Sequence, residues 1–407
     1  MRKLMISLIF GVLFTTYALA VIPTLYPDNP AFAFESPRKH LDLSGMNARL
    51  GFTSNLITIG DVNNLLTGEK IIFDASRLDL IGDDGFLLLP NILVPNHINV
   101  GFRNMKFGVN SRFFSNVSMN LPKETMRFVF GDYDFGESLD STFTLLKGGI
   151  YSEAGLLFGL KLGDISMALE GGAYVPYIWF DKESISSFHY SSNEDEGGFE
   201  LALSGKQKLY SLLNSFDSIE VDSEKLINSA GYYVSFGAVW DIGNFKVAAA
   251  LNNFSVKPAK LENYGYANVT FEASLSNLNF KSATPVVEFP KGKLEKLEEA
   301  TDVSLPYEVN LFASYSFSTL DIAFHGKYVP DMNSSEFGGY LGFRDIVWID
   351  LTMLPNNLWK KEVGLNWDTA HFRFTATVGV VDAGGLLNAD LSKMTGMSVK
   401  IGFGLGF

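Results

Sequence analysis

Apolar residues alternate with polar or small ones over long stretches of this chain, and the alternation is clearest at the C-terminus. There one face of the sequence is apolar and the other carries glycine, serine and lysine: Met397, Val399, Ile401, Phe403, Leu405 and Phe407 against Ser398, Lys400, Gly402, Gly404 and Gly406. A period of two is that of a β-strand, and about eleven residues is the length of a tilted transmembrane strand. We expect a closing membrane strand in which Phe403, Leu405 and Phe407 form an assembly signal. An edge strand of a soluble sandwich is the alternative.

Similar alternating runs occur at residues 107–121 and 309–317. After residue 20, no run approaches the roughly 18 apolar residues that a transmembrane helix requires. A chain with membrane-like composition but no such run can be embedded in a membrane only as a closed barrel. The pattern therefore predicts an all-β, antiparallel transmembrane β-barrel.

Short turns between alternating runs set the expected strand count. They fall at Gly163-Asp164, Gly243-Asn244, Ser318-Thr319, Arg344-Asp345 and Asp368-Thr369. The spacing predicts about 14 strands, with 12 to 16 allowed. Between the second and third turns, however, only three strands are apparent, at 244–257, 264–280 and 305–317, whereas turns on the same side of a barrel require an even number. Either residues 285–289 add a short strand or one turn is misassigned.

Four segments break the alternation. Residues 58–82 and 123–131 are expected to form short helices, and helices early in a barrel chain can fold inward and obstruct the interior (the lumen). Residues 205–229 and 292–301 are charged and helical in period, which favours solvated extracellular loops.

Composition narrows the class of protein. The 407 residues are 47% apolar, 14% aromatic and 19% charged, with no cysteine and a formal charge of −13. Such a chain is too apolar to be disordered and too acidic to bind nucleic acid, and it has no thiols for disulfides.

The first twenty residues have the features of a secretory signal peptide. Arg2 and Lys3 precede an apolar stretch at residues 4–14, and Ala18-Leu19-Ala20 is a small-x-small cleavage site. We expect cleavage after Ala20, export through the inner membrane, and a single barrel domain over residues 21–407 with a charge of −15. The absence of cysteine excludes a lipid anchor.

Enzymatic chemistry has no recognisable motif in this sequence. The histidines are dispersed singly and make no metal-ligand spacing: His40, His97, His189, His325 and His371. No nucleophile elbow and no phosphate loop occur. We therefore expect a protein that is not an enzyme and holds no cofactor or metal. The alternative is a barrel enzyme whose Ser, His and Asp lie on separate strands. The acidic run at residues 193–196 favours a solvated loop over a calcium site.

The tryptophans lie near predicted turns or loops, as an aromatic girdle at the membrane interfaces requires: Trp179, Trp240, Trp348, Trp359 and Trp367. Packing in the protein core is the alternative.

Short motifs are scattered along nearly the whole mature chain. In chain order they are Asn29-Pro30-Ala31, Ser54-Asn55-Leu56, residues 61–66, Leu121-Pro122, residues 160–164, Leu251-Asn252-Asn253-Phe254 and residues 400–403. Their order resembles a family of outer-membrane barrels related to the long-chain fatty-acid transporter and to the barrel subunit of a Bacteroidetes-type secretion system. The resemblance implies a barrel of roughly 14 strands with an N-terminal segment, residues 21–40, in or under the lumen. Asn29, Pro30 and Ala31 match the inward-folded hatch of the fatty-acid transporter, although the segment here is shorter.

Three functions are compatible with these observations. The first is an outer-membrane channel or transporter for small solutes, hydrophobic ones included, for which deletion of residues 21–38 should raise conductance. The second is a general diffusion porin, for which the acidic excess predicts weak cation preference. The third is a structural or secretion-linked scaffold with a plugged barrel. The expected partners are outer-membrane lipid, the barrel-assembly machinery and a small solute; homo-oligomerisation stays open.

Overall fold

The computed structural model describes residues 29–36, 38–67, 77–83, 85–134, 136–193, 198–212, 223–275, 294–317, 320–332, 334–343, 346–369, 371–382 and 394–407. The expected signal peptide and the acidic run at 194–196 lie outside these residues.

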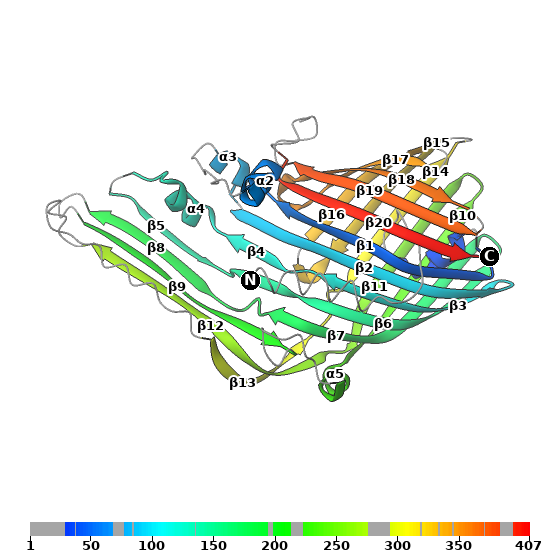
Figure 1. Ribbon diagram of the computed structural model, residues 1–407, viewed down its shortest axis with the longest axis horizontal. Helices are drawn as coiled ribbons and strands as arrows, with labels where there is room; N and C mark the ends of the chain where they lie inside the picture. Colours follow the sequence, from blue (N-terminus) through cyan, green and yellow to red (C-terminus); the bar gives the residue numbers. More distant parts are fainter. Residues whose placement is uncertain are drawn as a thin grey trace.

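Most of the described strands form one closed antiparallel barrel (Figure 1). Its wall has 14 strand positions, which run in this order: β1 (Leu41–Ser54), β2 (Phe86–Phe102), β3 (Met105–Ser115) continued by β4 (Ser118–Leu121), β6 (Leu146–Leu162), β7 (Ile165–Phe180), β10 (Gly231–Ile242), β11 (Phe245–Lys257), β14 (Glu308–Ser316), β15 (Leu320–Val329), β16 (Ser334–Phe343), β17 (Val347–Met353), β18 (Trp359–Asp368), β19 (Phe372–Asp382) and β20 (Gly396–Gly406). Ten residues of β1 pair with β20, so the first and last strands close the ring.

The even strand number places the short turns and both described chain ends at one end of the barrel. Turns such as Gly163-Asp164 and Gly243-Asn244 connect β6 to β7 and β10 to β11 there, with positive φ at each glycine. The longer connections lie at the opposite end. We call these the short-turn end and the loop end.

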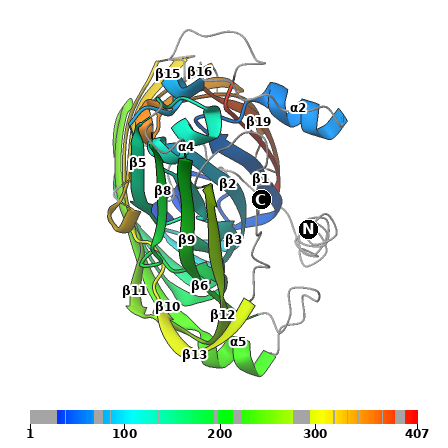
Figure 2. The same cartoon turned by 90° about the vertical axis from the view of Figure 1, so that its left-hand side faces the viewer.

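A second sheet extends from one side of the loop end (Figures 1 and 2). It consists of β5 (Ser138–Phe143), β8 (Ser186–Asn193), β9 (Gly198–Ser211), β12 (Ala259–Leu275) and β13 (Leu294–Val303). β9 joins it to the barrel through three pairs with β7.

β13 corrects the sequence-based expectation for residues 292–301. Their charge pattern favoured a helical loop, but the described ones, residues 294–301, belong to a strand that pairs with β12. β13 is the fourth described strand between the expected turns at Gly243 and Ser318, which gives the even number that parity requires. The alternative strand at 285–289 lies outside the described residues. A hairpin that extends beyond the membrane has no lipid-facing side, and its strands therefore need no apolar alternation.

The short helices lie in the long connections. They are α2 (Ile59–Thr67), α3 (Leu78–Ile81), α4 (Lys123–Phe130), α5 (Ser223–Ser229) and the 3₁₀ turns η3 (Pro330–Met332) and η4 (Pro355–Asn357). The expected helices at 58–82 and 123–131 are confirmed, whereas residues 205–211 belong to strand β9.

The described residues of the segment at 58–82, which are 58–67 and 77–82, lie at the rim and not in the lumen, which differs from the interpretation that this segment folds inward. Its described residues do not line the interior cavity, and α2 projects from the rim in Figure 2. Leu78 and Ile81 instead pack with Phe86 and Met126 in a small apolar cluster. The segment that does enter the barrel is the 3₁₀ turn η1 (Pro30–Glu35).

The alternation of the strands separates an apolar outer face from a polar inner one. On β18, Val363, Leu365 and Trp367 are exposed on the outside, whereas Glu362 is buried on the inside. The same division holds on β20, where Val399, Ile401 and Leu405 face outward. An apolar band around a polar interior is the arrangement of a membrane barrel.

No helix in the described ranges is long and apolar enough to cross a membrane.

Candidate functional site

The N-terminal segment, residues 29–36, enters the lumen near the short-turn end, and we call it the plug. Asn29 caps η1 because its side chain accepts a hydrogen bond from the Ala31 amide at 2.9 Å. Its Nδ2 donates to the carbonyl oxygens of Ala238 and Ala249, at 3.2 and 3.1 Å. These two residues face each other on β10 and β11. Asn29 therefore fixes the plug to the barrel wall as well as shaping it.

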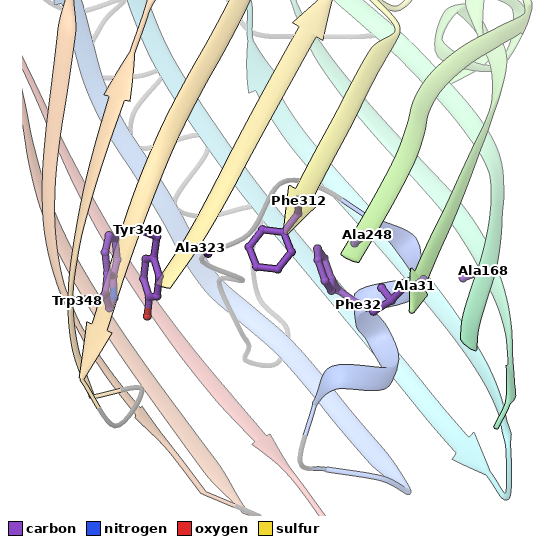
Figure 3. Packing of buried hydrophobic residues seen from close by; sticks show 9 residues of the cluster. Ala31, Phe32, Ala168, Ala248, Phe312, Ala323, Tyr340 and Trp348 are labelled. Carbon is purple, nitrogen blue, oxygen red and sulfur yellow. The ribbon is translucent and has the colours of Figure 1, made fainter. Parts of the chain in front are cut away.

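Apolar contacts hold the plug among the wall strands (Figure 3). Ala31 and Phe32 are buried in a cluster with wall residues from β7, β10, β11 and β14–β17: Ala168, Val239, Ala248, Phe312, Ala323, Tyr340 and Trp348. Phe32 meets Phe312 edge to face, with ring centroids 5.7 Å apart.

Two glycines of the wall make room for plug side chains. A Cβ atom at Gly237 would collide with the Asn29 side chain, and one at Gly159 would collide with the Phe34 ring. Both glycines lie in strands, where a residue without a side chain otherwise weakens packing. The wall therefore has notches that match the plug.

Charged groups also hold the plug in place. Lys106 of β3 donates to the Ala33 carbonyl, and Lys246 of β11 pairs with Glu35. Arg38, which follows the plug, is fully buried; it donates to Asp42 at 3.0 Å and to the Thr369 carbonyl at 3.0 Å. Removing one member of such a buried pair leaves an uncompensated charge, so the segment is strongly held.

Beside the plug lies a cavity of about 320 Å³. Asn29, Pro30, Phe32 and Ala33 form one side of it. The remaining lining comes from strands around most of the ring, and most of its residues are polar.

Opposite charges in the lining are balanced and mostly paired. The lining includes five basic and five acidic side chains, namely Arg49, Arg112, Lys327, Lys360, Lys400, Glu170, Glu308, Glu336, Asp350 and Glu362. Glu362 accepts from Arg49 and Lys360, Lys327 pairs with Glu308 at 2.7 Å, and Arg112 pairs with Glu153. His325 contacts Asp350 at 2.7 Å. The cavity consequently has little net charge to offer a solute.

Asparagine amides are the other frequent group in the lining: Asn29, Asn47, Asn96, Asn99, Asn110, Asn252 and Asn310. Asn47 is 1% exposed, and neither of its amide atoms has a hydrogen-bond partner among the described residues. The side-chain carbonyl oxygens of Asn96 and Asn99 also have no hydrogen-bond partner among the described residues. Sequence reasoning did not identify Asn47, Asn96 and Asn99, because asparagines on the polar face of a strand look alike until the ring is closed.

An irregularity in the wall accompanies these amides. β1 and β2 pair regularly on both sides of a register shift between Leu43 and Arg49, which face Ile98 and Leu93. Between these two pairs β1 has five residues and β2 has four, so β1 contains a bulge. Pro95, which has no amide hydrogen to donate to a ladder, lies opposite it. Asn47, Asn96 and His97 lie at this bulge and line the cavity.

Trp348 does not belong to the aromatic girdle that the sequence predicted. It is 4% exposed, faces the lumen and lines the cavity, and its indole lies over the Gly364 backbone. Trp240 and Trp367 are more than half exposed near short turns, whereas Trp179 packs against Tyr210 at the base of the second sheet. Trp359 is half-buried near the loop end. Proximity to a turn does not distinguish an inward ring from an outward one; only strand parity does.

The predicted assembly residues lie at the end of β20. Leu405 and Phe407 are exposed on the outer face, and Phe403 contacts Phe374 of β19 with ring centroids 5.2 Å apart. Their role in assembly stays a prediction.

No metal site is apparent: within the described ranges, no three His, Asp or Glu side chains are grouped to hold an ion.

Comparison with solved structures identifies outer-membrane barrels. The toluene transporter TbuX of Ralstonia pickettii is 8% identical with a TM-score of 0.41, covering 96% of this chain and 97% of its own. The toluene transporter TodX of P. putida is 9% identical with a TM-score of 0.43, covering 93% of both chains. A porin variant of Rhodopseudomonas blastica is 9% identical with a TM-score of 0.27, covering 90% of this chain and 99% of its own.

These likenesses carry no argument about solute, because identity and TM-score are both low. No protein-family model matches the chain, and a comparison with curated protein sequences gives no match.

Proposed function

We propose that the chain is an outer-membrane channel or transporter through which small solutes pass along the barrel axis, with the plug obstructing the short-turn end. The observation that carries the proposal is the fit of the plug to its wall, in which Asn29 and Phe34 occupy glycine notches at Gly237 and Gly159. A segment that only tethered the barrel would need no such notches. The apolar outer band supports a place in the outer membrane, with lipid as its partner.

The nature of the solute follows from the lining. The resemblance to the fatty-acid transporter pointed to hydrophobic solutes, and the similar structures include transporters described as carrying toluene. The cavity of this chain is instead lined by charged pairs and amides. A hydrocarbon cannot replace the hydrogen bonds of water in such a site. The lining therefore favours small polar solutes.

Deletion of residues 21–36 tests the proposal. The shortened chain keeps Arg38 and its contact with Asp42, so the start of β1 is undisturbed. We expect single-channel conductance in planar bilayers to rise well above that of the full chain. Deletion of α5 (Ser223–Ser229), which is of similar length to the plug and lies at the loop end, is the control and should leave conductance unchanged.

The alternative functions give different results in the same measurement. A general porin would conduct equally with and without the plug. A secretion-linked scaffold would not conduct in either form and would co-purify with a stoichiometric partner.

A further inference from the structure

The cavity beside the plug has hydrogen-bonding groups that the protein itself does not use. Asn47 is buried with both amide atoms unpartnered, and the carbonyl oxygen of Asn99, a residue 3% exposed, is also unpartnered. Both residues line the cavity. Buried amides without partners are costly, so such groups are expected to bind water or a ligand.

These groups are held in place rather than mobile. The Asn99 side chain lies over Gly108 of β3, where a Cβ atom would collide with its carbonyl oxygen. Asn47 lies in the β1 bulge, and bulges commonly re-aim a side chain. Trp348 also lines the cavity; its indole rests on Gly364, and its Nε1–H is buried with no partner among the described residues. Fixed donors and acceptors bind a solute with little loss of conformational freedom.

The charges of the cavity argue against an ionic solute. Glu362 is engaged by Arg49 and Lys360, Asp350 by His325 and Thr352, and Glu308 by Lys327. An added ion that bound to one of these side chains would have to disrupt its pair.

We infer that this cavity is a binding site for a neutral, multiply hydroxylated solute of monosaccharide to disaccharide size. A hydroxyl group both donates and accepts, and thus satisfies both ends of an amide as well as the indole N–H. A volume of about 320 Å³ lies at the lower end of small-molecule sites, which run from about 300 to 1,000 Å³. This inference rests on the proposed function, since it names the class of solute for the same lumen.

Glucose binding to the full chain in detergent micelles tests the inference. Isothermal titration should give saturable binding of glucose. Gluconate, which has a similar skeleton but a carboxylate, should bind at least about tenfold more weakly because its charge finds no free partner. Toluene should not displace glucose, because a hydrocarbon leaves the amides unpaired.

Asn47→Leu should weaken glucose binding about tenfold, which is the effect of losing two neutral hydrogen bonds. Asn104→Leu makes the same change in the β2–β3 turn, outside the cavity, and should bind glucose as the unaltered chain does. Circular dichroism checks that both variants fold. If the leucine variant fails to fold, Asn47→Asp takes its place. This substitution keeps the side-chain shape but loses the donor, and it should also weaken glucose binding.

The inference is overturned if glucose shows no saturable binding, if Asn104→Leu weakens binding as much as Asn47→Leu, or if toluene displaces glucose. Conductance keeps this result separate from the proposed function. A full chain that binds no glucose, together with a plug-deleted chain that conducts, overturns the inference alone. A chain that binds glucose but never conducts overturns the proposed function and keeps the site.

Discussion

Gly237 is the residue at which the plug is most sensitive to a single methyl group. A Cβ atom there would collide with Asn29, the residue that both caps η1 and donates to the wall carbonyls. The sequence could not identify this role, because the chain has many glycines and only the position of the plug distinguishes Gly237 and Gly159 as notches. Asn29 itself was recognised only through the resemblance.

Gly237→Ala should displace the plug and raise conductance. Overpacking of this kind costs about 1–3 kcal/mol, enough to populate a plug-out state. Single-channel recording measures the open fraction. Gly171→Ala is the matched control, because the nearest atom to its Cβ would lie 3.9 Å away. Equal open fractions for both variants would contradict the notch interpretation.

Asp61 gives the segment at 58–82 a dependence on pH. Burial raises the pKa of Asp61, but hydrogen bonds from Arg77 and Thr58 outweigh it and hold this pKa below its ordinary value of 3.8. A lowered pKa in the folded state stabilises the segment at pH above the ordinary value. That stabilisation is lost as the pH falls through the lowered pKa.

Pepsin cleavage of residues 58–81 between about pH 2 and pH 5 checks this dependence. We expect cleavage to increase toward the lower pH in the unaltered chain, since Asp61 then becomes protonated. Asp61→Asn should be cleaved readily across the whole range. Asp79→Asn, which alters an exposed residue of α3, should behave as the unaltered chain. A pH-independent cleavage rate in the unaltered chain would refute the role of the carboxylate.

At the scale of elements, alternation predicted the strands that face lipid and failed for those that do not. β20 is assigned from its sequence, because its outer face is apolar and its inner face is small or polar. β13 was mistaken for a helical loop, because Glu295, Lys296 and Glu299 follow a helical period and the strand lies outside the barrel wall. Alternation reports contact with lipid rather than strand geometry as such.

The break between β3 and β4 illustrates the same limit. Residues 107–121 alternate without interruption, but the strand is divided after Ser115, where Asn116 accepts from the Gly149 amide at 2.7 Å. A local hydrogen bond of a side chain to a neighbouring strand leaves the alternation unchanged, so the pattern does not reveal it.

Phe407→Ala should slow assembly of the barrel in the outer membrane. Phe407 is 61% exposed at the end of the strand that closes the ring, and its aromatic side chain is the proposed assembly signal. The fraction of chain that becomes resistant to protease after export measures assembly. Phe317→Ala removes a Phe side chain that is 52% exposed near a short turn and should have no such effect. If both variants assemble alike, the terminal aromatic has no special role.

At the scale of the whole molecule, net charge describes the lumen poorly. The chain carries −13, yet the cavity lining has as many basic as acidic side chains. The acidic excess of the sequence predicted weak cation preference for an open porin. The equal numbers of basic and acidic side chains in the lining give no reason for such a preference. Pairing across neighbouring strands, such as Arg49 with Glu362, depends on register and cannot be read from composition.

The plug-deleted barrel should accordingly show a reversal potential near zero in a salt gradient. Glu362→Gln in that background removes the acidic partner of Arg49 and Lys360 and should shift the reversal potential toward anion preference. Glu183→Gln, at an exposed position in the β7–β8 turn, is the control and should cause no shift. A cation-selective plug-deleted barrel would show that the loops, rather than the lining, set selectivity.

The closure of the ring by β1 and β20 separates the route by which the plug enters from the route by which it leaves. The plug directly precedes β1, so it is attached to one edge of the seam. While the seam is open during folding, the wall can form around the plug from the side. Once β1 and β20 have paired, only the barrel axis is left as an exit. On the proposed function, the plug would therefore be enclosed from the side during folding and would leave along the barrel axis. A substitution at the seam should then impair folding without altering movement of the plug.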